Sequence, residues 1–181
     1  MPSTPTFGWP YPDANTAADV PFDLQQALLS IEATLMKPMW RGYASSAQSK
    51  ASGTTSGITL TQDYEEDGSF AQGAASYVRN VPKAGIYDVR VMVTFAANAT
   101  GTRSAEIRKN PTGTDMSTGE VVSRAQGNGY SAGLSGLLAV WRGPLVVGDT
   151  IAIAGLQTSG AALDVVGTKY QTYMEIAWVR P

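Results

Sequence analysis

Four acidic side chains lie close together in the run Asp63, Glu65, Glu66 and Asp67. Carboxylate oxygens are ligands for calcium, and a pair of carboxylates can also hydrolyse a glycosidic bond. The spacing matches no EF-hand loop, because the alternating acids of that loop are absent. Glycoside hydrolysis needs two carboxylates held at a defined separation across a cleft, which neighbours in one segment do not indicate. We interpret the run 63–67 as a solvated turn, with calcium binding as the alternative.

The chain contains neither cysteine nor histidine. Their absence excludes disulfides, thiolate nucleophiles and thiolate metal sites, together with the commonest general base and the commonest imidazole ligand. Most familiar catalytic arrangements are therefore excluded. We predict a protein without enzymatic activity, metal or cofactor.

Aromatic side chains offer a second kind of chemistry, the binding of sugars. Trp141, Tyr170, Tyr173 and Trp178 lie in runs with strand character, and stacking of these rings on sugars is one hypothesis. Aromatic residues in strands more often fill a core or a subunit axis. We favour the core, and keep a carbohydrate-binding module or a glycan-degrading enzyme as the alternative function.

The charge and hydropathy of the chain argue against two classes of partner, nucleic acids and membranes. The formal charge is −2, and 13 basic residues are scattered without forming a stripe, so we expect no nucleic acid partner. No apolar stretch approaches the roughly 20 residues of a membrane helix, and the first residues lack the basic and apolar regions of a signal peptide. We expect no membrane insertion and no export by the usual secretory route.

An extended arm is predicted for residues 1–20, because its prolines disfavour both helix and central strand. The arm carries a cluster that we assign to docking: Phe7, Trp9, Pro10, Tyr11 and Pro12. Trp and Tyr are enriched at interface hot spots, and an extended segment can add to an exposed sheet edge. The alternative is an arm folded over its own domain.

A short helix is predicted over residues 21–37, since Pro21 suits a first turn and Pro38 ends the helix. Its apolar stripe has heptad spacing: Leu24, Leu28, Ile31 and Leu35. Such a seam predicts self-association of identical copies, although it is too short to hold them together alone. The alternative is a helix packed on its own β domain.

The remaining sequence alternates as β-strands do. In the clearest run, 85–96, one face is apolar and is predicted to be core: Tyr87, Val89, Val91, Val93 and Phe95. Shorter strand-like runs follow along the chain, with turn chemistry between them at sites such as 127–129. The segment 44–57 has almost no apolar bulk and is typical of a linker or a polar edge strand. These features predict an antiparallel sandwich or jelly roll.

The predicted organisation therefore has three parts. An extended anchoring arm spans 1–20, a short helical stalk and linker spans 21–43, and a β head domain spans 44–181.

Two segments of the head resemble a known architecture. The run Gly85–Phe95 is similar to the G-x-Y-x-V-x-x-x-V-x-F strand of complement-globular-head and tumour-necrosis-factor-like jelly rolls, and the similarity continues through Arg103–Asn110. Leu145–Ile151 resembles their L-x-x-G-D-x-I/V segment. The resemblance covers most of the chain. It implies a mainly β, antiparallel jelly roll that assembles as a homotrimer around aromatic residues.

The front of the chain has its own likeness. The run Phe7–Pro12, followed by a polar stretch and a short amphipathic helix, resembles the start of many tail-associated and other virion surface proteins of phages that infect actinobacteria. Together the two resemblances imply a non-enzymatic protein of the virion surface, with a docking arm, a three-helix stalk and a trimeric head. Its partners would be its own copies and other capsid or tail proteins. Binding of a host-surface glycan, and a place on the tail or on the capsid, stay open.

Overall fold

The structure is a computed structural model that describes residues 24, 26, 27, 37–66 and 70–181. The chain divides into two units, residues 1–37 and 38–181. In the first unit, Leu24, Gln26 and Ala27 are helical, within the span where the sequence predicts a helix. The predicted docking residues and the rest of the heptad stripe lie outside the described residues: Phe7, Trp9, Pro10, Tyr11, Pro12, Leu28, Ile31 and Leu35.

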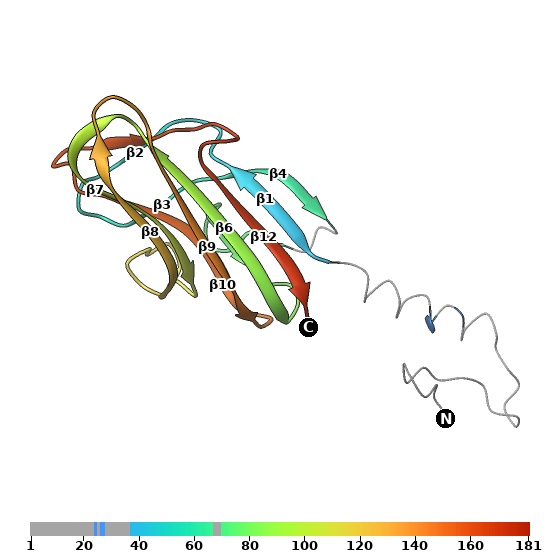
Figure 1. Ribbon diagram of the computed structural model, residues 1–181. Coiled ribbons are helices and arrows are strands. Elements are labelled where there is room, and N and C mark those ends of the chain that lie inside the picture. Colours follow the sequence, from blue (N-terminus) through green and yellow to red (C-terminus); the bar gives the residue numbers. More distant parts are fainter. Residues whose placement is uncertain (1–23, 25, 28–36, 67–69) are drawn as a thin grey trace, which may run out of the picture. The chain divides into compact units, whose positions relative to one another are not determined.

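The second unit is a sandwich of two antiparallel sheets (Figure 1). Seven strands form the larger sheet: β1 (Met39–Tyr43), β2 (Gln48–Lys50), β4 (Thr61–Glu66), β6 (Gly85–Phe95), β9 (Ser135–Leu145), β11 (Leu163–Val165) and β12 (Tyr173–Arg180). Their order is β2–β11–β6–β12–β1–β4, and β9 pairs with β6 along its other edge. Five strands form the smaller sheet: β3 (Ser56–Gly57), β5 (Val78–Asn80), β7 (Asn98–Lys109), β8 (Glu120–Tyr130) and β10 (Thr150–Gln157). Their order is β3–β10–β7–β8, with β5 beside β10.

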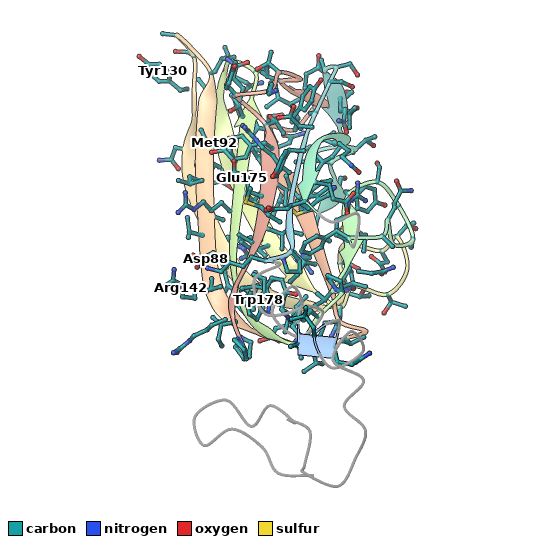
Figure 2. The ribbon with its side chains drawn as sticks, turned by 90° about the vertical axis from the view of Figure 1, so that its right-hand side faces the viewer. Asp88, Met92, Tyr130, Arg142, Glu175 and Trp178 are labelled. Atoms are coloured by element: carbon teal, nitrogen blue, oxygen red, sulfur yellow. The ribbon has the colours of Figure 1, made fainter. Side chains whose placement is uncertain are left out.

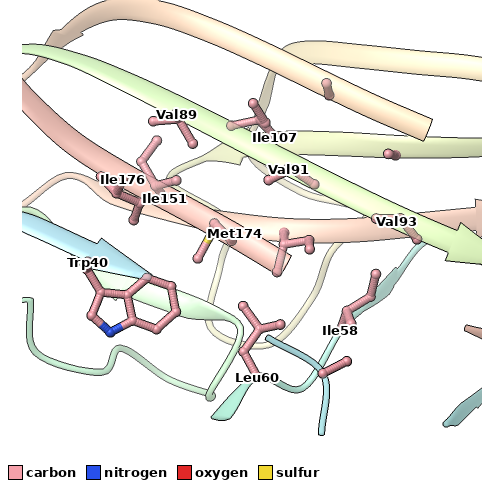
Figure 3. Close-up of a cluster of buried hydrophobic side chains, with 14 of the residues drawn as sticks. Trp40, Ile58, Leu60, Val89, Val91, Val93, Ile107, Ile151, Met174 and Ile176 are labelled. Carbon is pink, nitrogen blue, oxygen red and sulfur yellow. The ribbon is translucent and has the colours of Figure 1, made fainter. Parts of the chain in front are cut away.

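Strand β6 lies at the centre of the larger sheet and of the core. It pairs with β9 along its whole length on one edge, and with β12 and β11 on the other. The side chains on its inward face are all 0% exposed: Tyr87, Val89, Val91, Val93 and Phe95. They pack with Ile107 and Ile151 of the smaller sheet and with Met174 and Ile176 of β12 (Figure 3). Burial of these apolar faces between the sheets is the main source of stability.

Strand β1 takes up residues that the sequence assigns to the linker, 39–43. It lies between β12 and β4, with Met39 opposite Ala177, and the Trp178 backbone N–H donates to the Pro38 carbonyl at 2.8 Å. Trp40 is 0% exposed, which explains why this short segment joins the sheet. The β structure therefore begins before residue 44.

The tripeptide Trp-Arg-Gly occurs in both β1 and β9, at 40–42 and 141–143. In each copy the tryptophan ring lies over the glycine two residues later, because alternate residues of a strand share a face. A Cβ atom at either glycine would lie under 3.0 Å from ring atoms of that tryptophan. The arginine between them points to the opposite face of the sheet. An alanine at either position would therefore displace the tryptophan ring.

Trp40 is also held from the other sheet. The guanidinium of Arg79, on β5, lies 4.2 Å from the centre of the Trp40 ring, and Arg79 is only 4% exposed. Burial lowers the pKa of Arg79, and the charge of Glu65 opposes that effect. This cation–π contact joins the two sheets beside β4.

The glycines at 127–129, which the sequence assigns to a turn, lie inside strand β8. The turn to β9 comes later, at 131–134. A Cβ at Gly129 would lie under 3.0 Å from the Asn98 carbonyl oxygen, where the register of β7 shifts. Close approach of two backbones, and not a reversal of the chain, explains the glycine here.

Asp149 fixes the turn between β9 and β10, within the segment that resembles the jelly-roll motif. Its carboxylate accepts hydrogen bonds from the Val146 backbone N–H at 2.9 Å and the Asn110 side chain at 2.7 Å, and lies 3.0 Å from Lys109 Nζ. Burial alone would raise the pKa of Asp149, but these partners outweigh it and lower the pKa. Gly148, with φ of 95°, provides the left-handed residue of the turn.

The two Trp-Arg-Gly segments give a paired test of packing. We expect Gly42→Ala to lower the free energy of unfolding by about 2–3 kcal/mol, because Trp40 is enclosed and cannot move aside. Gly143→Ala should cost about 1 kcal/mol, since Trp141 is only half-buried and is less enclosed than Trp40. Urea denaturation of the two variants and the parent at one protein concentration measures both costs. Equal costs would contradict this account of the packing.

Candidate functional site

The outward face of the larger sheet aligns side chains from neighbouring strands in rows. The apolar row consists of Leu138, Met92, Tyr173 and Tyr43. The charged row consists of Val140, Arg90, Glu175, Arg41 and Tyr64. The third row consists of Arg142, Asp88, Ala177, Met39 and Glu66. Met92, Glu175, Asp88 and Arg142 can be followed down this face in Figure 2.

A hollow of about 500 Å³ opens on this face, and we call it the sheet hollow. Its volume is in the range of roughly 300–1,000 Å³ that is typical of small-molecule sites. Its lining comes from β1, β4, β6 and β12: Met39, Trp40, Arg41, Asp63, Tyr64, Asp88, Arg90, Glu175 and Ala177. The site therefore combines an apolar floor with several charged groups.

Arg41 is the centre of an ion-pair network in the hollow. Its Nε lies 3.2 Å from Glu175 Oε1, an ion pair without hydrogen-bond geometry, and its Nη1 lies 3.8 Å from Asp63 Oδ2. Lys169 Nζ lies 2.5 Å from Asp63 Oδ1, and this hydrogen bond raises the pKa of Lys169. The Arg41 guanidinium also lies 5.1 Å from the centre of the Tyr173 ring. Both carboxylates of this network therefore have cationic partners.

Asp88 is bound by a bidentate arginine. Arg142 Nε and Nη2 each donate to one carboxylate oxygen at 2.5 Å. These hydrogen bonds hold the pKa of Asp88 below its ordinary value and raise that of Arg142. The charge of Arg90 also lowers the pKa of Asp88, but Arg90 makes no hydrogen bond or ion pair with any described residue. Arg90 is thus the one lining cation without a direct partner among the described residues.

The acidic run that the sequence singles out is not a turn. Asp63, Glu65 and Glu66 belong to strand β4, and Asp67 lies outside the described residues. The register of β4 against β1 shifts at Asp63, so Asp63 and Glu65 have different surroundings although they are two residues apart. Asp63 pairs with Lys169, whereas Glu65 accepts a hydrogen bond from the Phe70 backbone N–H at 2.7 Å. Among the described residues, no three acidic side chains are grouped so that they could hold a metal ion.

The four aromatic residues considered for sugar stacking do not form one platform. Trp141 and Trp178 pack against the core, and the Trp178 indole N–H donates to the Ala84 carbonyl at 3.1 Å. Tyr173 belongs to the apolar row, and Tyr170 is 77% exposed in the loop before β12. The aromatic residues that line the sheet hollow are the exposed Tyr64 and the buried Trp40, neither of which the sequence singles out for sugar stacking.

The sheet hollow could not be located from the sequence. Asp88 and Arg90 follow the outward period of β6, so the alternation places them on the exposed face. Arg41 and Tyr64 reach the same site only through the pairing of β1 with β12 and β4. That pairing joins segments far apart in the chain and leaves no local signal.

No helix within the described part of the chain has the length and apolar character needed to cross a membrane.

Comparison with solved structures identifies the fold. Murine APRIL superposes with a TM-score of 0.61 at 12% sequence identity, over 79% of this chain and 99% of the APRIL chain. Eiger TNF from S. frugiperda superposes with a TM-score of 0.58 at 12% identity, over 80% of this chain and 92% of its own. The predicted antiparallel jelly roll of tumour-necrosis-factor type is therefore confirmed as the fold. No family model and no curated protein matches the sequence.

The carboxylates in the sheet hollow are poorly suited to glycoside hydrolysis. A general acid needs a raised pKa, whereas the pKa of Asp88 is lowered, and Asp63 and Glu175 are paired with cations. We expect no reducing ends to be released when the protein is incubated with bacterial cell-wall polysaccharide, with a glycosidase as positive control. Release that increases with protein concentration and disappears in Asp88→Asn would contradict this expectation.

Proposed function

We propose that this protein is a non-enzymatic homotrimer of a phage virion, attached through its N-terminal arm and displaying the jelly-roll unit at the particle surface. In this proposal residues 1–20 dock to a capsid or tail protein, and residues 21–37 form a short stalk. Its role is adhesion or reinforcement of the particle.

The apolar row is the observation that carries the trimer. Leu138, Met92, Tyr173 and Tyr43 lie side by side across β9, β6, β12 and β1, and Leu138 is 51% exposed. The two aromatic rings and the methionine are half-buried in the single chain. An apolar band on the outer face of a sheet is typical of a subunit interface. Packing against further copies would remove this band from water.

A closed ring of three copies needs two different patches on each copy, because its contacts are heterologous. The edge made by β8 and β9 supplies a second group of exposed apolar side chains: Val121, Tyr130, Leu134 and Val140. Ser123 Oγ joins these strands by donating to the Val140 carbonyl at 2.9 Å. The apolar row of one copy and this edge of the next are the surfaces that we assign to the interface.

The assignment to a virion rests on the front of the chain. The segment Phe7–Pro12 and the helix that follows it resemble the start of phage virion surface proteins. The heptad spacing of Leu24, Leu28, Ile31 and Leu35 suits three helices aligned beneath a trimeric head. The lack of cysteine and histidine, and the paired carboxylates of the sheet hollow, favour a structural role over turnover.

Light scattering tests the trimer directly. The full chain of 19.1 kDa should give a mass of about 57 kDa, three times the monomer. Met92→Glu should shift the mass toward the monomer, because burying an unpaired carboxylate in an apolar interface is costly. Tyr170→Glu is the matched control, since it places the same charge at an exposed site outside the apolar row. A monomeric parent protein, or a trimeric Met92→Glu, would overturn the proposed interface.

Removal of the arm tests the docking role. Deletion of residues 1–15 should abolish incorporation into particles and leave the trimer intact, because the docking cluster lies in this segment and the interface does not. Complementation of a phage that lacks the gene, followed by immunoblotting of purified particles, measures incorporation. Loss of the trimer in the same variant would instead show that the arm is part of the fold.

A further inference from the structure

We propose that the sheet hollow binds an acidic oligosaccharide, with a sugar carboxylate on Arg90 and a sugar ring against Tyr64. The inference rests on the proposed function for the display of the jelly-roll unit at the particle surface, with the hollow open to solvent beside the subunit contact. It adds a ligand class and a site that the fold alone does not supply.

The charge balance of the hollow favours an anion. Three carboxylates line it, and three cations pair with them: Arg41 and Lys169 with Asp63, Arg41 also with Glu175, and Arg142 with Asp88. Arg90 is left over, on the central strand β6 and exposed. A planar guanidinium with free N–H donors is suited to a carboxylate, which it can bind with two parallel hydrogen bonds.

The remaining groups suit a sugar. Tyr64 is 45% exposed, and its hydroxyl makes no hydrogen bond with any described residue. Met39 and Ala177 supply an apolar surface for the C–H face of a sugar ring. Asp88 and Glu175, already neutralised by arginines, have oxygen lone pairs that can accept from sugar hydroxyls. A ring that is apolar on its faces and polar at its edge matches this lining.

The length of the hollow favours an oligosaccharide over a single sugar. Tyr64 and Arg90 belong to the charged row, with Arg41 and Glu175 between them. Three interstrand spacings of about 4.8 Å separate their strands, or roughly 14 Å. A chain of two or three sugar rings is long enough to span strands at that separation.

A second copy of the chain is the competing occupant of the hollow. The interface that we assign to the trimer uses the apolar row, two residues along the strands from the charged row, and Val140 at the β9 end of the charged row. Apolar side chains from a neighbour would leave Arg90 desolvated without a partner, which is costly. A cation that has neither a hydrogen bond nor an ion pair with a described residue therefore favours an anionic ligand. The oligomeric state of the variants distinguishes the two occupants.

Isothermal titration of the full chain with trigalacturonate tests the inference at low ionic strength. We expect saturable binding, weaker binding of monogalacturonate, and no binding of the neutral trisaccharide maltotriose. Arg90→Gln should weaken trigalacturonate binding at least about tenfold, because a charge-assisted hydrogen bond is lost. Tyr64→Ala should weaken it as well. Arg180→Gln, which removes an exposed arginine at the end of β12, should leave it unchanged.

Light scattering on the same samples separates the two proposals. A trimer that does not bind trigalacturonate, or whose Arg90→Gln variant binds as tightly as the parent, overturns the acidic-saccharide site alone. Conversion of Arg90→Gln to a monomer shows that the hollow is a subunit contact and also overturns it. A monomeric parent overturns the trimer, whether or not it binds the sugar.

Discussion

The structure depends on strand β6, which is hydrogen-bonded along both edges and buried on one face. Its inward side chains, from Tyr87 to Phe95, fill the space between the sheets, so any change of register would bring charged residues into the core. Only the outward side chains of this strand remain available to contact anything else. Because β9 and β12 pair in register with β6, their side chains are divided between the same inward and outward faces. Function on the larger sheet is therefore confined to one face, and the rows of side chains on that face are set by β6.

The sequence predicts the parts of the fold that follow from local alternation. The run 85–96 has period two, and its five apolar residues lie in the core. Prediction fails where a distant segment decides the local structure. The sequence does not predict strand β1, because Trp40 is held by contacts with β5 and β12, which are distant in the chain. The glycines at 127 and 129 predict a turn, because their contact with the backbone of β7 cannot be read from the sequence. The sheet hollow combines four strands, and only the pairing of those strands brings Tyr64 and Arg90 into one row.

The outward face carries two kinds of surface in adjacent rows. Removing water from the apolar row lowers the free energy of the system. In the charged surface beside it, arginines pair with carboxylates, so the charges are compensated within the chain. One sheet face therefore presents both an apolar surface and a polar hollow. Arg41 links the two, because its guanidinium lies over Tyr173 of the apolar row while it pairs with Glu175 and Asp63. A change at Arg41 would therefore disturb both surfaces together.

The position of β1 has a mechanical consequence. This strand is the first of the β unit, and it is hydrogen-bonded on both sides, to β12 and to β4. A pull on residue 38 along the strand would load these hydrogen bonds in shear, all at once, because they lie perpendicular to the strand. Peeling a terminal strand from the edge of a sheet would instead break its bonds one after another. Trp40 is held between the sheets by Arg79, so sliding of β1 along its neighbours would also break this contact. If the β unit is pulled through its N-terminal side, the force therefore acts first on β1, the strand whose hydrogen bonds resist it together.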